Sequence, residues 1–352
     1  MKVVFYSVYE ELNLGNRLFE NPQAEIGDNL LAPFLKLNEF AKLCGISIGT
    51  VDKIPIHDAD VVVIVDMKIP GTYKLRALLS CGKPLFLIAL ESPLIRPESH
   101  CLEYHSIFKK VFTWNDELIK LDPAKYLKIN YAFDLSSSLP EIDFIEKKNF
   151  CCLIAGNKKT DHPQELYSER LRAIYWFERN HPSEFDLFGT GWNEVALGDS
   201  IWINFFLRRS AVLRKMFASK RPSYKGQLDR KRPVLEKYKF SICYENALDI
   251  SGYITEKIFD SFFANCVPIY LGANNIETYV PKSCFIDRRD FANYRDLYNY
   301  LKSIKEPEYN NYLENIRSFL NSPSAQSFSC ESFATSIVEQ LKLFQIKTSF
   351  TD

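Results

Sequence analysis

Residues 238–291, YKFSICYENALDISGYITEKIFDSFFANCVPIYLGANNIETYVPKSCFIDRRDF, decide the fold of this chain. An apolar run at 239–245 is followed by a helical pattern from Thr255 and by a second apolar run at 267–271. Apolar side chains recur through the helical pattern at the spacing of one helix face, which we expect to pack on a sheet. Strand, helix and strand in this order predict a parallel pair joined by a crossover helix.

The same alternation of short apolar runs and amphipathic segments extends over most of the chain. Apolar runs at 2–8, 61–67, 84–91 and 109–114 alternate with helical patterns in the first half, and the alternation restarts at Phe150. Continuous apolar strands of this kind are typical of a parallel sheet that helices cover on both faces. The fold class is therefore α/β, with two Rossmann-like, doubly wound domains.

A polar stretch that contains proline, residues 134–148, is the predicted linker between these domains. We expect an N-terminal Rossmann-like acceptor-binding domain at 1–145. A C-terminal donor-binding domain with terminal helices would follow at 146–352. The cleft between two such domains is the natural place for a ligand.

Composition narrows the class of protein. The 352 residues include 46% hydrophobic residues, and 44 basic residues balance 44 acidic ones, so no overall field favours nucleic acid. The one strongly basic segment, 208–237, is interpreted first as a solvated helix and loop, with an anionic acceptor or a lipid headgroup surface as alternatives. Nine cysteines without a CxxC pair, and a start that does not resemble a signal peptide, predict a cytoplasmic protein with at most peripheral membrane contact.

The chemistry is concentrated where the strand at 239–245 ends and the next helix begins. Lys257 falls in the first turn of that helix, where free N–H groups and the helix dipole already favour an anion such as a diphosphate. The neighbouring Glu256 can accept hydrogen bonds from both hydroxyls of a ribose. Together the two side chains predict a nucleotide site.

The pattern ENxxxxxxYxTEK, followed by VPIYxG and FIDxxDF, resembles the donor-binding motif of the α-1,3-fucosyltransferases. The resemblance implies two Rossmann-like domains of the GT-B type facing across a cleft, GDP-fucose as donor and transfer with inversion. It also implies that Asn246, Tyr253, Glu256 and Lys257 contact the donor. Ala247 departs from the pattern, because the family usually has Ser there.

Two further segments resemble the same family. LYSERLRAIYWF is similar to the segment whose arginine reaches the donor phosphates, which favours Arg170, with Arg172 as the alternative. The segment Glu91-Ser92-Pro93 ends an apolar strand, and FTWND follows at a similar place. A carboxylate at the carboxyl end of a parallel strand faces the cleft, so Glu91 is the predicted general base.

A metal ion is not expected. The DxD sequence at His57-Asp58-Ala59-Asp60 precedes a strand and should lie at the edge of the sheet away from the cleft, and the five histidines lack zinc-site spacing. The absence of GxGxxG after the first strand argues against an NAD-dependent dehydrogenase.

The predicted partners are GDP-fucose or a related GDP-sugar and an oligosaccharide or glycolipid acceptor, with no nucleic acid. Acceptor-binding loops are expected at 10–29. Two other functions remain open, namely a transferase of the same fold that uses a different GDP-sugar, and a catalytically idle glycan-binding protein.

Overall fold

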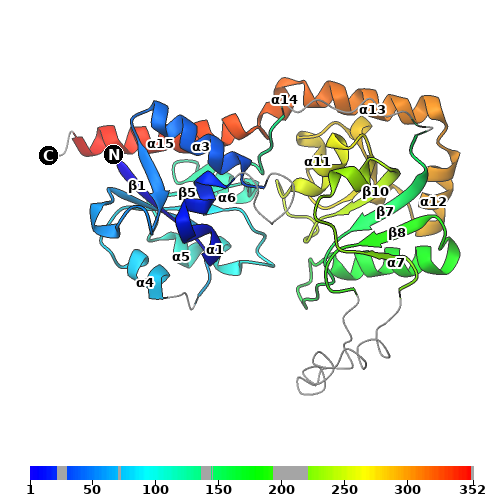
Figure 1. Cartoon of the computed structure of the whole chain (residues 1–352), viewed down its shortest axis with the longest axis horizontal. Coiled ribbons are helices and arrows are strands. Elements are labelled where there is room, and N and C mark those ends of the chain that lie inside the picture. Colours follow the sequence, from blue (N-terminus) through cyan, green and yellow to red (C-terminus); the bar gives the residue numbers. More distant parts are fainter. Residues whose placement is uncertain (22–29, 70–72, 136–143, 145, 193–220, 350–352) are drawn as a thin grey trace, which may run out of the picture.

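Two lobes, each built on one sheet, make up the structure (Figure 1). Every strand pair between named strands of either sheet is parallel. The computed structural model describes residues 1–21, 30–69, 73–135, 144, 146–192 and 221–349. The predicted α/β class with two Rossmann-like domains is therefore confirmed.

The N-terminal lobe contains a six-stranded sheet in the order β2-β1-β3-β4-β5-β6. Its strands are β1 (Lys2–Ser7), β2 (Ser47–Thr50), β3 (Val61–Val65), β4 (Leu85–Ala89), β5 (Lys110–Thr113) and β6 (Tyr126–Lys128). Its helices are α1 (Glu10–Asn13), η1 (Leu14–Asn16), α2 (Arg17–Glu20), α3 (Ala32–Leu43), η2 (Ile56–Asp58), α4 (Tyr73–Leu79), η3 (Pro97–His100), α5 (Leu102–His105) and α6 (Asp116–Leu121).

Side chains of the central strands alternate between two hydrophobic cores. Val61 and Val63 pack into a cluster with residues of α3, whereas Val62 and Ile64 pack into another cluster with residues of α4 and α6. Successive side chains of a strand point to opposite faces, so a run of five buried residues in β3 requires cover on both sides. The apolar runs of the sequence thus correspond to a doubly covered sheet.

The C-terminal lobe contains the second sheet, in the order β12-β11-β10-β7-β8-β9. Its strands are β7 (Asn149–Ile154), β8 (Phe185–Phe188), β9 (Tyr224–Gly226), β10 (Tyr238–Tyr244), β11 (Val267–Leu271) and β12 (Ile286–Asp287). Its helices are α7 (Tyr167–Asn180), α10 (Arg232–Leu235), α11 (Glu256–Phe263), η4 (Ile276–Thr278), η5 (Lys282–Cys284), η6 (Arg288–Asp290), α12 (Tyr294–Ser303), α13 (Glu306–Leu320) and α14 (Pro323–Gln326).

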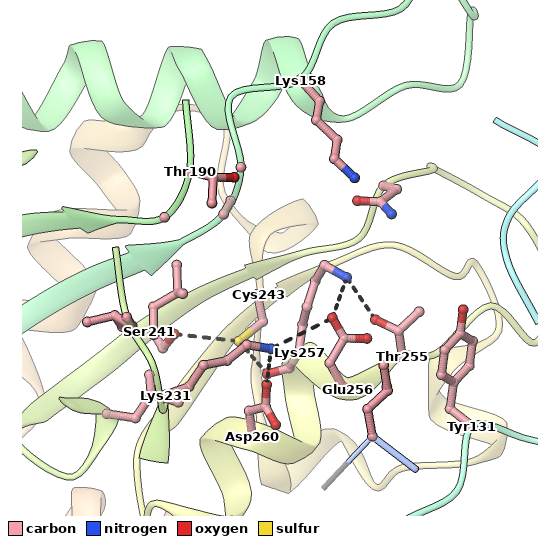
Figure 2. Close-up of a pocket in the computed structure, with 18 of the residues that line it drawn as sticks. Tyr131, Lys158, Thr190, Lys231, Ser241, Cys243, Thr255, Glu256, Lys257 and Asp260 are labelled. Atoms are coloured by element: carbon pink, nitrogen blue, oxygen red, sulfur yellow. Dashed lines mark hydrogen bonds and ion pairs between the residues drawn. The ribbon is translucent and has the colours of Figure 1, made fainter. Parts of the chain in front are cut away.

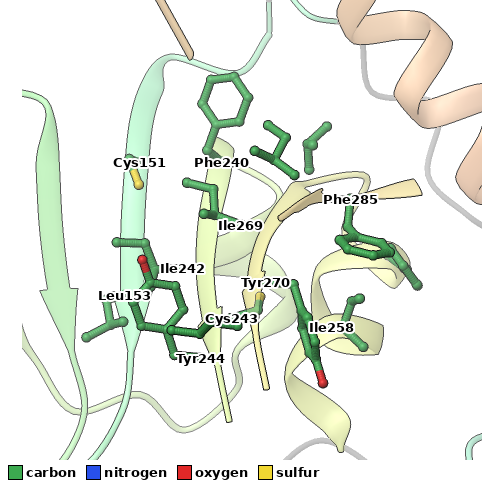
Figure 3. Close-up of a cluster of buried hydrophobic side chains, with 14 of the residues drawn as sticks. Cys151, Leu153, Phe240, Ile242, Cys243, Tyr244, Ile258, Ile269, Tyr270 and Phe285 are labelled. Atoms are coloured by element: carbon green, nitrogen blue, oxygen red, sulfur yellow. The ribbon is translucent and has the colours of Figure 1, made fainter. Parts of the chain in front are cut away.

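Helix α11 joins β10 to β11 and is held by its apolar face. Ile258, Phe259 and Phe262 are fully buried, and Figure 3 shows Ile258 beside Tyr270 of β11. Burying one such side chain stabilises the fold by about 1.5–3 kcal/mol, so these three anchor the helix firmly. This anchoring fixes the first turn of α11, where Glu256 and Lys257 lie.

The last helix, α15 (Cys330–Ser349), returns to the N-terminal lobe and packs beside α3 (Figure 1). Phe333, Ile337 and Leu341 enter the same cluster as Leu37 of α3. The chain therefore passes between the lobes twice, first after β6 and again after α14.

Several predicted segments differ from the structure in detail. Strand β6 ends at Lys128, whose ammonium group donates to the Tyr279 hydroxyl of the other lobe at 2.7 Å. The expected acceptor loop at 10–29 begins as the short helices α1 and α2, and residues 22–29 lie outside the described residues. Most of the expected linker, 134–148, lies outside them as well, so the domain limits at 145 and 146 stay a prediction.

Candidate active site

A cavity of about 690 Å³ opens between the two lobes, on the side of the carboxyl ends of β4 and β10. All six residues predicted to form the site line this cavity: Glu91, Arg170, Asn246, Tyr253, Glu256 and Lys257. Figure 2 shows its floor, with α11 carrying Glu256 and Lys257. The volume is within the range of small-molecule sites, which is roughly 300–1,000 Å³.

The turn from β10 to α11 is organised by Glu245, which the sequence analysis did not assign to a role. Its carboxylate accepts hydrogen bonds from the backbone N–H of Thr255 at 2.8 Å and from its hydroxyl at 2.6 Å. Glu245 is fully buried, and this burial raises the pKa of its carboxyl group. The acidic residue at the end of β10 therefore fixes the residue that precedes α11.

Lys257 and Glu256, which are both partly buried, form a cluster of charges with the fully buried Glu245. The Lys257 Nζ lies 2.9 Å from the Thr255 hydroxyl, 3.2 Å from Glu256 and 3.3 Å from Glu245. Burial alone would lower the pKa of Lys257, but the two carboxylates outweigh it and raise that pKa. Lys257 is therefore cationic at the cavity wall.

Glu256 stays ionised for the complementary reason. Burial disfavours its charge, but Lys257 and Lys231 outweigh that effect and lower the pKa of the Glu256 carboxyl. The Lys231 Nζ is 3.9 Å from Glu256 and 2.7 Å from Asp260, which lies one turn further along α11. Glu256 is therefore an ionised acceptor that faces the cavity, as binding of ribose hydroxyls would require.

Lys231 and Asp260 also line the cavity, and sequence reasoning missed both. Of the basic segment 208–237, which was interpreted first as a solvated helix and loop, residues 208–220 lie outside the described chain. The described part contains β9, the short helix α10 and loops, and most of its residues are exposed or partly buried, although Arg221 pairs with Glu178 at 3.1 Å. Asp260 could have been found, because it follows Glu256 at the i, i+4 spacing that places two side chains on one helix face.

Arg170, not Arg172, faces the cavity. Its guanidinium donates to the backbone oxygen of Tyr244 at 2.6 Å through Nη2 and at 3.2 Å through Nε. The same Nη2 donates to the Asn246 side chain at 3.0 Å. Arg172 is 72% exposed at its side chain and pairs with Glu169. The two arginines occupy different faces of α7, and the sequence pattern could not decide which of them faces the cavity.

Lys158 is a second cation that sequence reasoning missed. It follows β7 and lines the cavity, and Figure 2 shows its ammonium group directed down into the cavity from the side opposite Lys257. Among the described residues, the structure gives Lys158 no ion-pair partner. Cations on opposite walls suit a ligand with more than one negative charge.

Glu91 lies at the carboxyl end of β4 in the other lobe, where the sequence analysis expected it. Its Oε1 accepts a hydrogen bond from the Tyr9 hydroxyl at 2.6 Å. Its backbone N–H donates to both carboxylate oxygens of Asp66, at 3.2 and 3.3 Å. Burial, followed by the charge of Glu91, raises the pKa of the Asp66 carboxyl to about 7. Glu91 is thus held at the cavity wall by both side chain and backbone.

The DxD sequence lies at the opposite edge of the N-terminal sheet, as expected. Asp60 precedes β3 and accepts a hydrogen bond from the backbone N–H of Lys2 at the start of β1. Within the described residues, no three His, Cys, Asp or Glu side chains form a group that could hold a metal ion. Over the same residues, no helix combines the length and apolar character that a membrane crossing needs.

Comparison with known proteins finds a family that this chain resembles around α11. Residues 212–337 match the family described as "Glycosyltransferase family 10 (fucosyltransferase) C-term". The match covers less than half of the chain. The matched region contains α11, with Glu256 and Lys257, and all of the motif on which the resemblance was based.

Proteins similar to this chain include "Alpha-(1,3)-fucosyltransferase FucT" of Helicobacter pylori, 40% identical over 73 residues, which are 20% of this chain and 15% of that protein. Another is "4-galactosyl-N-acetylglucosaminide 3-alpha-L-fucosyltransferase 9" of Rattus norvegicus, 38% identical over 218 residues, which are 61% of this chain and 47% of that protein. This chain therefore matches less than half the length of either protein.

The fold of this chain is similar to that of a solved structure, "Crystal Structure of alpha1,3-Fucosyltransferase". The TM-score is 0.53 with 16% sequence identity, and the superposition covers 96% of this chain and 90% of the other. At this identity the similarity concerns the fold alone. It supports the GT-B type of arrangement that the motif implied.

Proposed function

We propose that the chain is an inverting α-1,3-fucosyltransferase that moves L-fucose from GDP-fucose to a hydroxyl group of a glycan. One observation carries the proposal. A carboxylate from one lobe, Glu91, and a cationic cluster from the other, Arg170 and Lys257, line the same cavity. Transfer from a nucleotide sugar requires a base on the acceptor side and positive charge on the leaving-group side.

In the proposed reaction, Glu91 takes the proton of an acceptor hydroxyl. The oxygen attacks the anomeric carbon of fucose from the face opposite GDP, and the bond from that carbon to the diphosphate oxygen breaks. GDP leaves with both bonding electrons, and the transition state resembles an oxocarbenium ion. No protein nucleophile is needed, and the configuration at the anomeric carbon inverts.

The donor contacts have separate proposed roles. Arg170 and Lys257 stabilise the charge that develops on the leaving diphosphate, which preorganised charged groups can do by about 3 kcal/mol each. Glu256 accepts hydrogen bonds from the ribose hydroxyls, and its lowered pKa keeps it in the accepting form. Asn246 and Tyr253, whose side chains approach to 3.4 Å, complete the wall beside Arg170.

We also propose that transfer needs no metal ion and uses an oligosaccharide or glycolipid acceptor, in protein glycosylation or polysaccharide biosynthesis. All nine cysteines are free thiols and six are buried, which fits a reducing cytoplasm with at most peripheral membrane contact. A different GDP-sugar and a catalytically idle glycan-binding protein are the alternatives that donor profiling and turnover distinguish.

The first experiment is calorimetric titration of the metal-free protein with GDP, UDP and NAD in the presence of a chelator, followed by transfer assays with GDP-fucose and other GDP-sugars. Arg170→Ala should weaken GDP binding, whereas Arg172→Ala, two residues away on the exposed side of α7, is the matched control. Thermal unfolding of both variants shows whether they remain folded. The proposal fails if the protein prefers UDP or NAD, or if the two arginine variants bind GDP equally well.

A further inference from the structure

Side chains bind every backbone polar group of Leu90 and Glu91. Asp66 accepts from the N–H of Leu90 at 3.0 Å as well as from that of Glu91. The Leu90 oxygen accepts from Trp114 Nε1 at 2.6 Å and from the Tyr131 hydroxyl at 2.7 Å. The Glu91 oxygen lies 2.6 Å from His100 Nε2. Side chains thus hold the backbone of Leu90 and Glu91, the two residues that follow the end of β4.

The protonation states of these groups suit the arrangement. Burial lowers the pKa of His100 to about 4, so its ring is neutral near pH 7 and must carry the proton on Nε2 to donate to the Glu91 oxygen. Burial also raises the pKa of Tyr131 well above its usual value. Both groups are therefore hydrogen-bond donors over the range in which Glu91 would work as a base.

The two side chains that bind the Leu90 oxygen also contact the donor side of the cavity. The ring centroid of Trp114 lies 4.7 Å from that of Tyr253, and the ring centroid of Tyr131 lies 6.3 Å from it. Trp114 and Tyr253 are buried in one small cluster with Ala247. Tyr253 belongs to the C-terminal lobe and precedes α11 by only three residues.

These contacts form a continuous connection across the junction between the lobes. Trp114 follows β5 and Tyr131 follows β6, so both are fixed to the N-terminal sheet. Each touches Tyr253 with its ring and Leu90 with its polar group. A shift of Tyr253 relative to these rings would move the backbone that carries Glu91, since both hydrogen bonds end on one carbonyl oxygen.

We propose that Trp114 and Tyr131 are positioning residues, which set the place of Glu91 relative to the donor-binding residues by joining the Leu90 carbonyl to Tyr253. This inference rests on the proposed function, in which Glu91 is the base. Neither side chain takes part in the chemistry. Their effect is to keep the base at reacting distance when donor occupies the opposite lobe, where small displacements reduce rates strongly.

Tyr131→Phe tests the inference because it removes only the hydroxyl and keeps the ring. The Leu90 oxygen still accepts from Trp114, so no buried carbonyl is left unpaired and the protein should fold. We expect kcat to fall on the order of tenfold, while the KM for GDP-fucose and the Kd for GDP change by less than about twofold. Trp114→Phe removes the other donor and should act in the same direction.

Tyr300→Phe is the matched control, since Tyr300 also loses a hydroxyl hydrogen bond, to Tyr312 at 2.8 Å, far from the cavity. A merely structural role for Tyr131 would lower the melting temperature and leave kcat at the level of Tyr300→Phe. That result would overturn the inference and leave the proposed function standing.

Hydrogen exchange gives a readout that does not depend on transfer. GDP should slow exchange of the Leu90 and Glu91 amides in the wild type, and should slow it less in Tyr131→Phe. Exchange that is unaffected by bound GDP would refute the connection although GDP binds. If the wild type binds no GDP, the proposed function and this inference both fail.

Discussion

Lys257 has two possible roles, one in stability and one in donor binding, and a pair of substitutions can separate them. The ammonium group lies between the carboxylates of Glu245 and Glu256, so it could serve either to neutralise them or to bind the donor diphosphate. Lys257→Ala should lose both contributions. Breaking a buried ion pair by removing one partner costs about 3–5 kcal/mol of folding free energy. That cost applies here because the fully buried carboxylate of Glu245 would lose its cation.

A second substitution, Glu245→Gln, removes the buried negative charge that Lys257 neutralises, so combining it with Lys257→Ala isolates the role of Lys257 in GDP binding. In the double variant Lys257→Ala with Glu245→Gln, the fully buried position 245 carries no charge and Glu256 keeps Lys231, at 3.9 Å, as its cation. The amide oxygen of Gln can still accept from the Thr255 N–H. We expect the double variant to recover most of the lost stability. GDP binding should not recover, because one charged contact to phosphate contributes about 1.5–3 kcal/mol, or roughly 10- to 100-fold in Kd.

The assay pairs urea unfolding with calorimetric titration of GDP for the wild type, the single variants and the double variant. Glu245→Gln alone is the control, and should bind GDP with nearly the affinity of the wild type. The reasoning would be refuted by a double variant that is stable and binds GDP as tightly as the wild type. Lys257 would then be a structural cation whose only function is to neutralise two acidic residues.

Three further predictions concern the N-terminal lobe and the junction. Glu91→Gln should lower the transfer rate by about 10²–10⁴-fold while GDP affinity stays the same, and retention of full transfer would contradict the assignment of the base. Asp66 has a pKa raised to about 7 when folded, so it binds more protons than the unfolded chain between about pH 4 and 7 and its contribution to stability falls as pH rises through that window. Urea unfolding across the window should show that Asp66→Asn removes up to about 4 kcal/mol of the fall in unfolding free energy with rising pH. His100, which is neutral when folded, makes the unfolding free energy rise with pH, but this effect is the same in the variant and the wild type and cancels when the two are compared. Gly252→Ala should destabilise the junction, as measured by thermal unfolding, because Gly252 has a φ of +82° and a Cβ there would lie 2.2 Å from the Trp114 oxygen.

The sequence predicted the fold well because its signals are local. Runs such as 61–65 are buried on both faces, and their length and β-branched content leave little alternative to a parallel strand. The motif around Glu256 and Lys257 was found for the same reason, since strand end, turn and helix start lie within twenty residues. Glu91 was found because it ends an apolar strand.

Other parts of the site depend on contacts between distant segments. Whether Arg170 or Arg172 faces the cavity depends on how α7 is rotated against the sheet, and both positions fit the helical pattern. The pairing of Lys231 with Asp260 brings together residues 29 positions apart, within a basic segment that has no periodic pattern. Tyr131 lies beyond the end of a short strand, and only the tertiary structure brings it to the carbonyl oxygen of Leu90, the residue before the proposed base Glu91.

The return of α15 to the N-terminal lobe determines how this molecule could be divided. Phe333, Ile337 and Leu341 fill the apolar face beside α3, so a fragment that stops after the linker would leave that face uncovered. In terms of architecture, the C-terminal lobe is an insertion within the N-terminal lobe, which is completed by residues 330–349. An exchange of C-terminal lobes between related proteins would therefore need two junctions, one at each place where the chain crosses between the lobes.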